Sequence, residues 1–203
     1  MPLVDFLTLG FTSYFLGSIP FGLIVSKLRG IDIRLHGSKN IGATNVVRVL
    51  GKKWGIITFF LDALKGFIPS FFFPLFFKGS QFDDIGVLFG VFSILGHTFS
   101  IFLNFKGGKG VATSAGMLAG IVPLAALIGI ISWTVCLSVS KYVSVSSIVA
   151  SFVVLLVVLL DKSCSSILQI LMISITILII FLHKENIKRL LNGTENKITK
   201  EKK

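Results

Sequence analysis

Charged residues are scarce in this chain, and their scarcity excludes an ordinary soluble domain. Only 14% of the 203 residues are charged, while 53% are hydrophobic. A soluble domain carries about a quarter charged residues. A composition this poor in charge is typical of a protein that crosses a membrane several times.

The chain also lacks the short segments of alternating polarity that transmembrane strands require. Its apolar runs are continuous and long, at about residues 6–26, 54–77, 85–105, 111–140, 142–160 and 163–182. Only helices and closed barrels satisfy their backbone hydrogen bonds in lipid. We therefore expect an all-α integral membrane protein.

Metal-ligating residues are too few and too scattered to predict a metal site. Cys136 and Cys164 lie in or beside apolar runs, where cysteine acts as a small hydrophobic residue. The three histidines, His36, His97 and His183, are far apart in the sequence, and the acidic residues show no ligand spacing. We expect no metal and no cofactor, and an activity that survives chelation.

Acidic residues are also few, 9 against 20 basic ones, and the basic residues are clustered. They gather in 27–53 and in the tail after residue 183, whereas the linker 78–84 has more acid than base. Because Lys and Arg concentrate on the cytoplasmic side, the N-terminus is expected outside and the tail in the cytoplasm. No soluble basic domain is present to bind nucleic acid, so the expected partner of this charge is the lipid bilayer.

The number of spans follows from the basic tail. An even number of crossings must follow the loop at 105–113, but three apolar runs remain. The run 111–140 is long for one helix, and Pro123 offers a break into two short helices. This division predicts a seven-transmembrane-helix bundle, multi-pass in the cell (inner) membrane, as a single domain over 1–203. Five spans, with one later run not crossing, is the alternative.

The stretch "GSKNIGATNVVR", residues 37–48, combines small residues with hydrogen-bond donors. Glycines let a backbone approach a ligand closely, and the planar fork of Arg48 matches a phosphate. An ordinary turn with Ser and Asn caps is the plainer alternative, but it does not account for so many donors beside an arginine.

The stretch "FKGGKGVAT", residues 105–113, lies between two apolar runs. It is not the nucleotide-binding loop G-x-x-x-x-G-K-S/T, because its spacing differs and no strand precedes it. We expect it to open a helix, whose N-terminal N–H groups and dipole favour an anion, with Lys109 adding a full charge. A flexible loop with two cytoplasmic lysines is the alternative.

The third polar stretch, "HKENIKRLLNGTE" at 183–195, follows the last span. His183 and Asn186 are three residues apart, so they share a helix face at the membrane edge. A plain interfacial histidine is the alternative. The polar groups of all three stretches therefore collect at one face of the membrane, where we expect the working site.

Two charged residues and a histidine lie inside apolar runs. Asp62 and Lys65 are three apart, and each would cost about 2.5–3.5 kcal/mol at a helix centre. We expect them to pair with one another and to be structural. His97, in "GHTF", is expected to be a packing residue. The alternative is that His97 donates a hydrogen bond that supports the site.

Together these stretches resemble the bacterial membrane glycerol-3-phosphate acyltransferases of the PlsY family, over nearly the whole chain. "GSKNIGATN" with Arg48, "FKGGKGVAT" and "HKENIKRLLNGTE" carry the resemblance, and "LDALKG" at 61–66 adds to it. The family commonly has a proline where this chain has Ser100. The resemblance implies seven spans with the N-terminus outside and an active site that faces the cytoplasm.

The resemblance also implies a reaction. An acyl group would pass from acyl phosphate to the 1-hydroxyl of sn-glycerol 3-phosphate, giving lysophosphatidic acid and phosphate in the first step of phospholipid biosynthesis. Acyl-CoA and acyl carrier protein would not serve as donors. An enzyme that produces acyl phosphate would then be an upstream partner.

The candidate site residues come from these motifs. The expected catalytic residues are Ser38, Arg48, Lys109, His183 and Asn186. The expected substrate-binding residues are Asn40, Gly42, Thr44, Asn45, Gly107, Gly108 and Gly110. The expected structural residues are Asp62, Lys65 and Glu195.

Each role has its reason. Lys109 and Arg48 would clamp phosphate, with Ser38 and the glycine N–H groups as hydrogen-bond donors. The resemblance implies that His183 and Asn186 orient glycerol 3-phosphate. His183 is the one nearby group whose ordinary pKa suits a general base, but we favour the substrate's own phosphate for that role.

A transporter for phosphorylated anions is the competing class, because glycine breaks and basic residues suit it. The gathering of polar groups at one face, and the lack of an apparent inverted repeat, count against it. A structural lipid-binding protein would explain the lysines but neither the glycine loop nor the His183–Asn186 pair.

Overall fold

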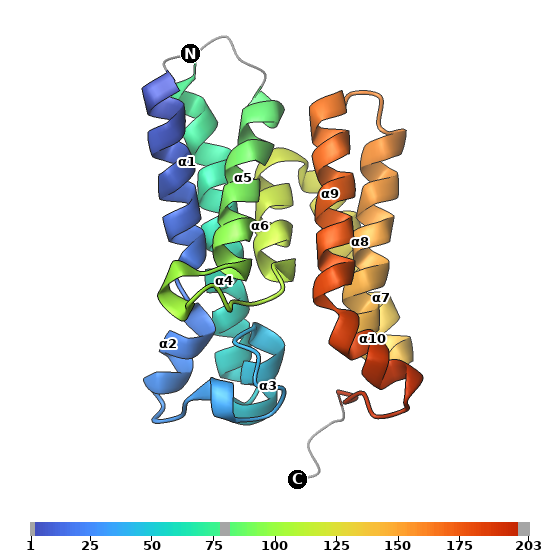
Figure 1. Ribbon diagram of the computed structural model, residues 1–203. Helices are drawn as coiled ribbons and strands as arrows, with labels where there is room; N and C mark the ends of the chain where they lie inside the picture. The colour runs from blue at the N-terminus through green and yellow to red at the C-terminus, as the bar shows by residue number, and fades with distance from the viewer. Residues whose placement is uncertain (1–2, 78–81, 199–203) are drawn as a thin grey trace. The chain divides into compact units, whose positions relative to one another are not determined.

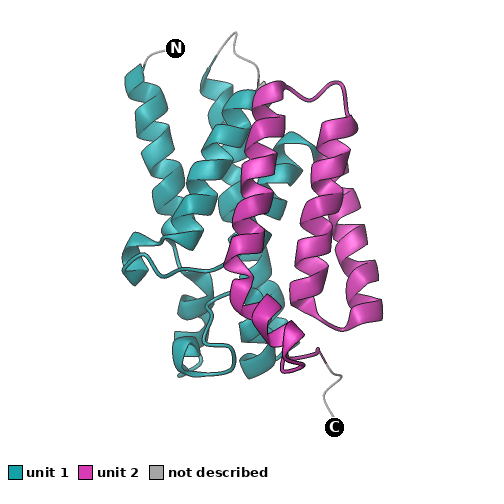
Figure 2. Ribbon diagram, turned by 45° about the vertical axis from the view of Figure 1, so that its right-hand side comes forward, with its two compact units in different colours: residues 1–122 teal, residues 123–203 magenta. Residues whose placement is uncertain are grey.

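The computed structural model describes residues 3–77 and 82–198, and every regular element in those ranges is a helix. This confirms the all-α class. The chain divides into two compact units, residues 1–122 and 123–203, drawn in teal and magenta in Figure 2. Part of the linker 78–84, and Lys200, Lys202 and Lys203 of the tail, lie outside the described residues. The assignment of 1–203 to one domain stays a prediction.

Unit 1 is a helical bundle with short elements at the helix ends (Figure 1). Its helices are α1 (Leu3–Ser18), α2 (Phe21–Lys27), α3 (Ala43–Leu50), α4 (Lys52–Phe72), α5 (Phe82–Thr98) and α6 (Val111–Ile121). Helices α1 and α5 run in one direction and α4 and α6 in the other (Figure 1). Short 3-10 helices cover Ile33–Leu35, Phe73–Phe76 and Ile101–Leu103. Helix α5 packs against α1, α4 and α6, and α4 also packs against α3 and α6.

Glycines bring the backbones of α4 and α6 into contact. A Cβ on Gly66 would lie 2.0 Å from the carbonyl oxygen of Thr113, and one on Gly116 would lie 1.8 Å from that of Ala63. Both distances are far below van der Waals contact, so a larger residue at either position would force the helices apart. Small residues serve this purpose between helices in membranes. The contact sets the position of α6, and therefore of the loop before it.

Unit 2 contains α7 (Pro123–Ser140), α8 (Val143–Leu160), α9 (Ser166–Leu182) and α10 (Lys184–Leu191). Helix α8 packs against α7 and α9. Ser165 caps the start of α9, and its side chain accepts a hydrogen bond of 3.1 Å from the backbone N–H of Leu168. This bond satisfies one of the donors that a helix start leaves unpaired.

The predicted break in the run 111–140 is confirmed, since α6 ends at Ile121 and α7 begins at Pro123. Within the described residues, five helical segments are long and apolar enough to cross a membrane: Leu3–Lys27, Lys52–Phe76, Asp84–Leu103, Pro123–Ser140 and Val143–Leu160. Helices α9 and α10 make a sixth if the pair, bent by 52°, forms one span. Helix α6, at 11 residues, is shorter than each of these candidate spans. A count of seven spans therefore stays a prediction.

Candidate active site

Asn45 organises the loop that precedes α3. Its side-chain amide donates to the carbonyl oxygens of Ile33, His36 and Asn40 at 3.3, 3.0 and 2.8 Å, and its Oδ1 accepts from the backbone N–H of Ser38 at 2.8 Å. Asn45 is 1% exposed. In this structure Asn45 therefore holds the loop together, and a direct contact with substrate stays a prediction.

The rest of the first motif lies on or beside α3. The Oδ1 of Asn40 accepts from the backbone N–H of Gly42 at 2.8 Å, which shapes the turn into the helix. Thr44 is on the first turn of α3 and Arg48 on the last, and both are half-buried. The side chain of Ser38 is exposed. The motif is thus a loop followed by a short helix, and its arginine is carried by the helix.

The glycine loop lies against the end of α5. The backbone N–H of Gly107 donates to the carbonyl oxygen of Thr98 at 2.9 Å, and that of Gly108 to His97 at 3.0 Å. These two N–H groups are therefore engaged within the protein. Gly110, with a φ of +75°, caps the start of α6 in the left-handed conformation that glycine adopts most easily. The expectation that this stretch opens a helix is confirmed.

Two residues with positive φ lead into the glycine loop. Asn104 has a φ of 50° and Phe105 a φ of 61°, and an aromatic residue rarely adopts that conformation. The backbone N–H of Phe105 donates to the carbonyl oxygen of Ser100 at 2.8 Å, which holds this turn closed. Lys109, four residues further on, is half-buried.

The first motif and the segment that precedes the glycine loop share one hydrophobic cluster in unit 1. Leu23, Val25, Ile33, Ile41 and Val46 form its buried centre, and Leu103 packs against it from the segment before the glycine loop. Unit 1 therefore gathers the first motif and the glycine loop at the same end of its bundle.

The expected pairing of Asp62 with Lys65 is confirmed. The Lys65 Nζ lies 2.9 Å from Asp62 Oδ1, and both side chains are 3% exposed. Lys65 Nζ also donates to the carbonyl oxygen of Ile19 at 3.0 Å, where α1 ends. His97 Nδ1 lies 3.6 Å from the same Asp62 oxygen. The three side chains form a buried cluster, and His97 places this cluster next to Gly108 of the glycine loop.

In unit 2, His183 lies at the bend between α9 and α10 and is 3% exposed. Its Nδ1 lies 2.8 Å from the carbonyl oxygen of Ile179. Because a carbonyl can only accept, Nδ1 carries the proton, and the neutral ring then has its lone pair on Nε2. That tautomer is the one a general base requires.

Asn186 and Glu195 belong to a hydrogen-bonded cluster that connects α10, the segment after it and α8. Glu195 Oε1 accepts from Asn186 Nδ2 at 2.6 Å and from Ser144 Oγ at 2.9 Å, and Oε2 accepts from Arg189 Nε at 2.7 Å. Burial raises the pKa of Glu195, but the hydrogen bonds from Asn186, Arg189 and Ser144 together outweigh it and hold the pKa below its ordinary value.

The hydrogen bonds of two serines were not predicted from the sequence. Ser144 binds Glu195, but it lies in an apolar run where a serine gives no signal of its partner. Ser100 Oγ donates to the carbonyl oxygen of Ser18 at 2.6 Å, and its φ is −65°, the value that a proline imposes. The chain thus keeps a backbone angle at position 100 that suits the family's proline, and adds a hydrogen bond to α1.

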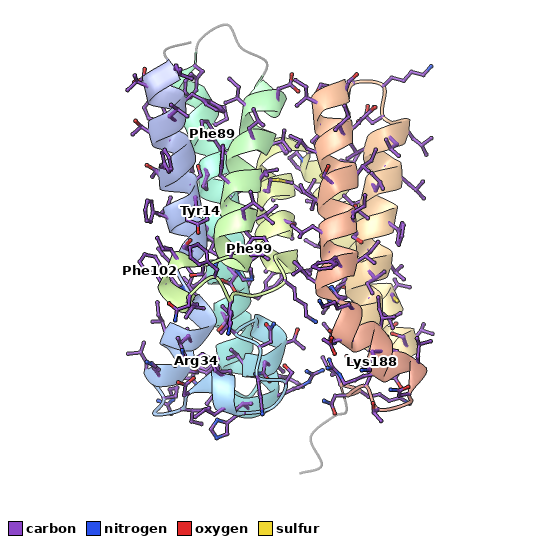
Figure 3. All side chains as sticks on the ribbon, in the orientation of Figure 1. Tyr14, Arg34, Phe89, Phe99, Phe102 and Lys188 are labelled. Carbon is purple, nitrogen blue, oxygen red and sulfur yellow. The ribbon has the colours of Figure 1, made fainter. Side chains whose placement is uncertain are left out.

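Unit 1 also has an apolar groove of about 430 Å³ beside the glycine loop. It is lined by Phe6, Leu7, Gly10, Phe11, Tyr14, Phe92, Leu95, Phe99 and Phe105. At the lower part of α1, Tyr14 and Phe99 lie next to each other (Figure 3), and the Tyr14 hydroxyl donates to the Phe99 carbonyl oxygen at 2.7 Å. Because these side chains are almost all apolar, the groove suits a hydrocarbon chain.

A bundle of apolar helices, with a glycine loop that opens a helix beside a lysine, is typical of a membrane protein that handles a phosphorylated ligand. Comparison with known proteins makes this class specific. The family model "Glycerol-3-phosphate acyltransferase" matches residues 7–193. The glycerol-3-phosphate acyltransferase of Acholeplasma laidlawii is 45% identical, over 94% of this chain and 91% of the relative. That of Aquifex aeolicus is 44% identical, over 91% of this chain and 95% of the relative.

A solved structure agrees with these relatives. The crystal structure of PlsY (YgiH), an integral membrane glycerol 3-phosphate acyltransferase in its glycerol 3-phosphate form, is 41% identical. It matches with a TM-score of 0.90 over 96% of each chain. This chain belongs to the glycerol-3-phosphate acyltransferase family and is a membrane acyltransferase. The comparisons therefore favour the enzyme over the transporter.

Proposed function

We propose that this chain transfers an acyl group from acyl phosphate to the 1-hydroxyl of sn-glycerol 3-phosphate, giving lysophosphatidic acid and phosphate. The observation that carries the proposal is the glycine loop with Lys109 at the start of α6, in a chain of this family. The similar PlsY has been solved in a glycerol 3-phosphate form and in a lysophosphatidic acid form, which supports the same acceptor and product here.

Both substrates carry a phosphate, and unit 1 offers groups that suit one. The first turn of a helix presents N–H groups without partners inside the helix, and its dipole favours an anion. Helix α6 begins in this way two residues after Lys109. Arg48 supplies a second cation, which can bind two phosphate oxygens at once. Ser38 is exposed at the same end of the unit and adds a hydroxyl donor.

The chemistry needs little covalent help from the protein. The 1-hydroxyl oxygen attacks the acyl carbonyl carbon, the bond from that carbon to the phosphate oxygen breaks, and phosphate leaves with the electron pair. The hydroxyl proton passes to a phosphate oxygen of the substrate or to His183. The enzyme contributes by placing the hydroxyl near the carbonyl and by neutralising phosphate charge.

His183 and Asn186 would orient glycerol 3-phosphate. Both are buried on unit 2, and each already has a partner that fixes its side chain, Ile179 for the imidazole and Glu195 for the amide. Fixed side chains position a substrate at a smaller entropic cost than mobile ones. Glu195 would act through Asn186 and not on the substrate itself.

The proposal also includes the topology and the supply of donor. Seven crossings, with the N-terminus outside and the site at the cytoplasmic face, agree with the distribution of basic residues. Helix α6 is counted as one of the seven, although its 11 residues span only about 16 Å. Labelling of single cysteines from each side of intact cells tests the topology.

Because acyl phosphate is the proposed donor, an upstream enzyme that makes acyl phosphate would be required.

Purified protein in detergent, given palmitoyl phosphate and glycerol 3-phosphate, tests the reaction through the release of phosphate and the formation of lysophosphatidic acid. Parallel reactions contain palmitoyl-CoA in place of the acyl phosphate. We expect turnover with palmitoyl phosphate as the donor and none with palmitoyl-CoA. Turnover with the thioester at an equal rate would contradict the proposed donor.

The variant Lys109→Ala tests the glycine loop in the same assay. Loss of one cation from a phosphate site is expected to lower kcat/KM by roughly 100-fold or more. Lys106→Ala is the matched control, because Lys106 is an exposed lysine of the same loop and its loss should cost much less. Equal losses in the two variants would indicate a general effect of positive charge and not a site at Lys109.

A further inference from the structure

The imidazole of His97 lies between the buried ion pair and the glycine loop. On one side its Nδ1 faces Asp62 at 3.6 Å, and the ring is only 4% exposed. On the other side its Nε2 lies against Gly108, since a Cβ added at Gly108 would be 2.1 Å from that nitrogen. The ring therefore contacts the loop at the residue immediately before Lys109.

The backbone of His97 supports the same loop. Its carbonyl oxygen accepts the hydrogen bond of the Gly108 N–H at 3.0 Å, and a Cβ added at Gly107 would be 1.9 Å from that oxygen. Neither Gly107 nor Gly108 has a positive φ. Close approach to His97, and not an unusual backbone angle, is therefore the reason that these two positions suit glycine.

The Asp62–Lys65 ion pair holds the His97 ring on the side away from the glycine loop. Asp62 is held by Lys65 at 2.9 Å, and Lys65 is held in turn by the carbonyl oxygen of Ile19. Ser93 Oγ donates to the Lys65 carbonyl oxygen at 2.6 Å, which ties α5 to α4 one turn before His97. A charged pair this deep in an apolar bundle must keep its geometry, because either charge alone would be costly there.

We propose that His97 is a positioning residue, which transmits the fixed geometry of the Asp62–Lys65 pair to the glycine loop and so sets the place of Lys109 and the start of α6. His97 does not touch substrate in this assignment. The inference rests on the proposed phosphate-binding role of the loop. It assigns to the buried charged cluster a role in affinity for glycerol 3-phosphate, beyond its role in folding.

The two glycines provide a matched test. Gly108→Ala places a methyl group against the ring of His97, whereas Gly107→Ala places one against the backbone oxygen of the same residue. Shortening the side chain by His97→Asn removes Nε2 but keeps a polar atom toward Asp62. It can therefore relieve the first clash and cannot relieve the second.

The experiment measures KM for glycerol 3-phosphate, kcat with palmitoyl phosphate, and thermal unfolding with and without glycerol 3-phosphate. The proteins are the wild type, the three single variants and the two double variants that contain His97→Asn. We expect Gly108→Ala to raise KM and to reduce the stabilisation by glycerol 3-phosphate. Adding His97→Asn should restore kcat/KM by about tenfold over Gly108→Ala alone, but should not improve Gly107→Ala.

The outcomes separate the inference from the proposed function. A purely structural His97 would lower the melting temperature of His97→Asn and leave KM for glycerol 3-phosphate unchanged, which would overturn the inference. Equal improvement of both glycine variants, or of neither, would also overturn it. If the wild type turns over no acyl phosphate, the proposed donor fails, while the shift of the unfolding temperature by glycerol 3-phosphate still tests the role of His97.

Discussion

Asn186 donates a hydrogen bond of 2.6 Å from its side-chain amide to Oε1 of Glu195, nine residues further along the chain. Glu195 lies beyond the end of α10, so this bond ties the following segment back to the helix. The same carboxylate accepts from Ser144 on α8 and from Arg189 on α10. One buried carboxylate therefore fixes the side chain of a candidate catalytic residue and joins two helices of unit 2.

Replacing this carboxylate by an amide should damage both stability and activity. In Glu195→Gln the amide NH₂ would face at least one of the donors Asn186, Arg189 and Ser144, and a donor cannot accept their hydrogen bonds. Loss of hydrogen bonds to a buried charged group predicts about 3 kcal/mol of destabilisation. Ser144→Ala, which removes one hydroxyl donor, should cost about 1 kcal/mol. Thermal unfolding in detergent measures both losses of stability. Equal losses in the two variants would contradict the conclusion that Glu195 is the shared acceptor of these hydrogen bonds.

The lowered pKa of Glu195 predicts a pH dependence of stability. A carboxyl group whose pKa is lower in the folded protein stabilises the fold above its ordinary pKa, 4.5 for this group. That contribution is lost as the pH falls through the lower pKa of the folded state. The melting temperature of the wild type should therefore fall below pH 4.5 more steeply than that of Glu195→Gln. Parallel curves for the two proteins would show that Glu195 does not carry the effect.

The sequence predicted the elements of this fold better than the contacts between them. The helical class, the break at Pro123, the helix after the glycine loop and the Asp62–Lys65 pair all follow from local spacing. The partner of Glu195 on α8 does not, because Ser144 is distant in sequence and serines are common in apolar helices. The contact of His97 with Gly108 depends on how a loop folds back on α5, which no periodicity reports.

The buried ion pair should be more sensitive to the loss of one charge than to the loss of both. Asp62→Asn leaves the Lys65 ammonium in an apolar bundle without its carboxylate, which predicts about 3–5 kcal/mol of destabilisation. The double variant Asp62→Leu with Lys65→Met replaces the pair by apolar side chains and should recover much of that loss. Its KM for glycerol 3-phosphate should still be raised, because His97 would lose the carboxylate behind it. Unfolding and kinetics are measured on the same preparations.

The glycines between α4 and α6 predict a steric effect on folding. Gly66→Ala puts a methyl group 2.0 Å from a backbone oxygen of α6, and a backbone atom can move only if the helices separate. Gly120→Ala on α6 is the control, since its Cβ would be 3.3 Å from the nearest atoms of α4. We expect a loss of about 2–3 kcal/mol for Gly66→Ala and less than about 1 kcal/mol for Gly120→Ala. Similar losses would show that the helices can adjust at both places.

The structure allows a clean test of His183 as general base. Its Nδ1 donates to the carbonyl oxygen of Ile179, and an asparagine amide can make the same bond from a similar position. His183→Asn therefore keeps the local hydrogen bond while it removes Nε2, the nitrogen that would accept a proton. If His183 is the base, kcat should fall by about 100-fold or more, with the affinity for glycerol 3-phosphate nearly unchanged.

The alternative predicts a different pattern for the same variant. If the phosphate of the substrate takes the proton and His183 only orients glycerol 3-phosphate, kcat and the binding of glycerol 3-phosphate should fall together. The pH profile separates the two further: a histidine base makes kcat decrease as the pH falls through the pKa of the ring, and His183→Asn removes that decrease. We expect the combined loss, because the neighbouring candidate Asn186 can only bind and because the acyl phosphate already supplies a good leaving group.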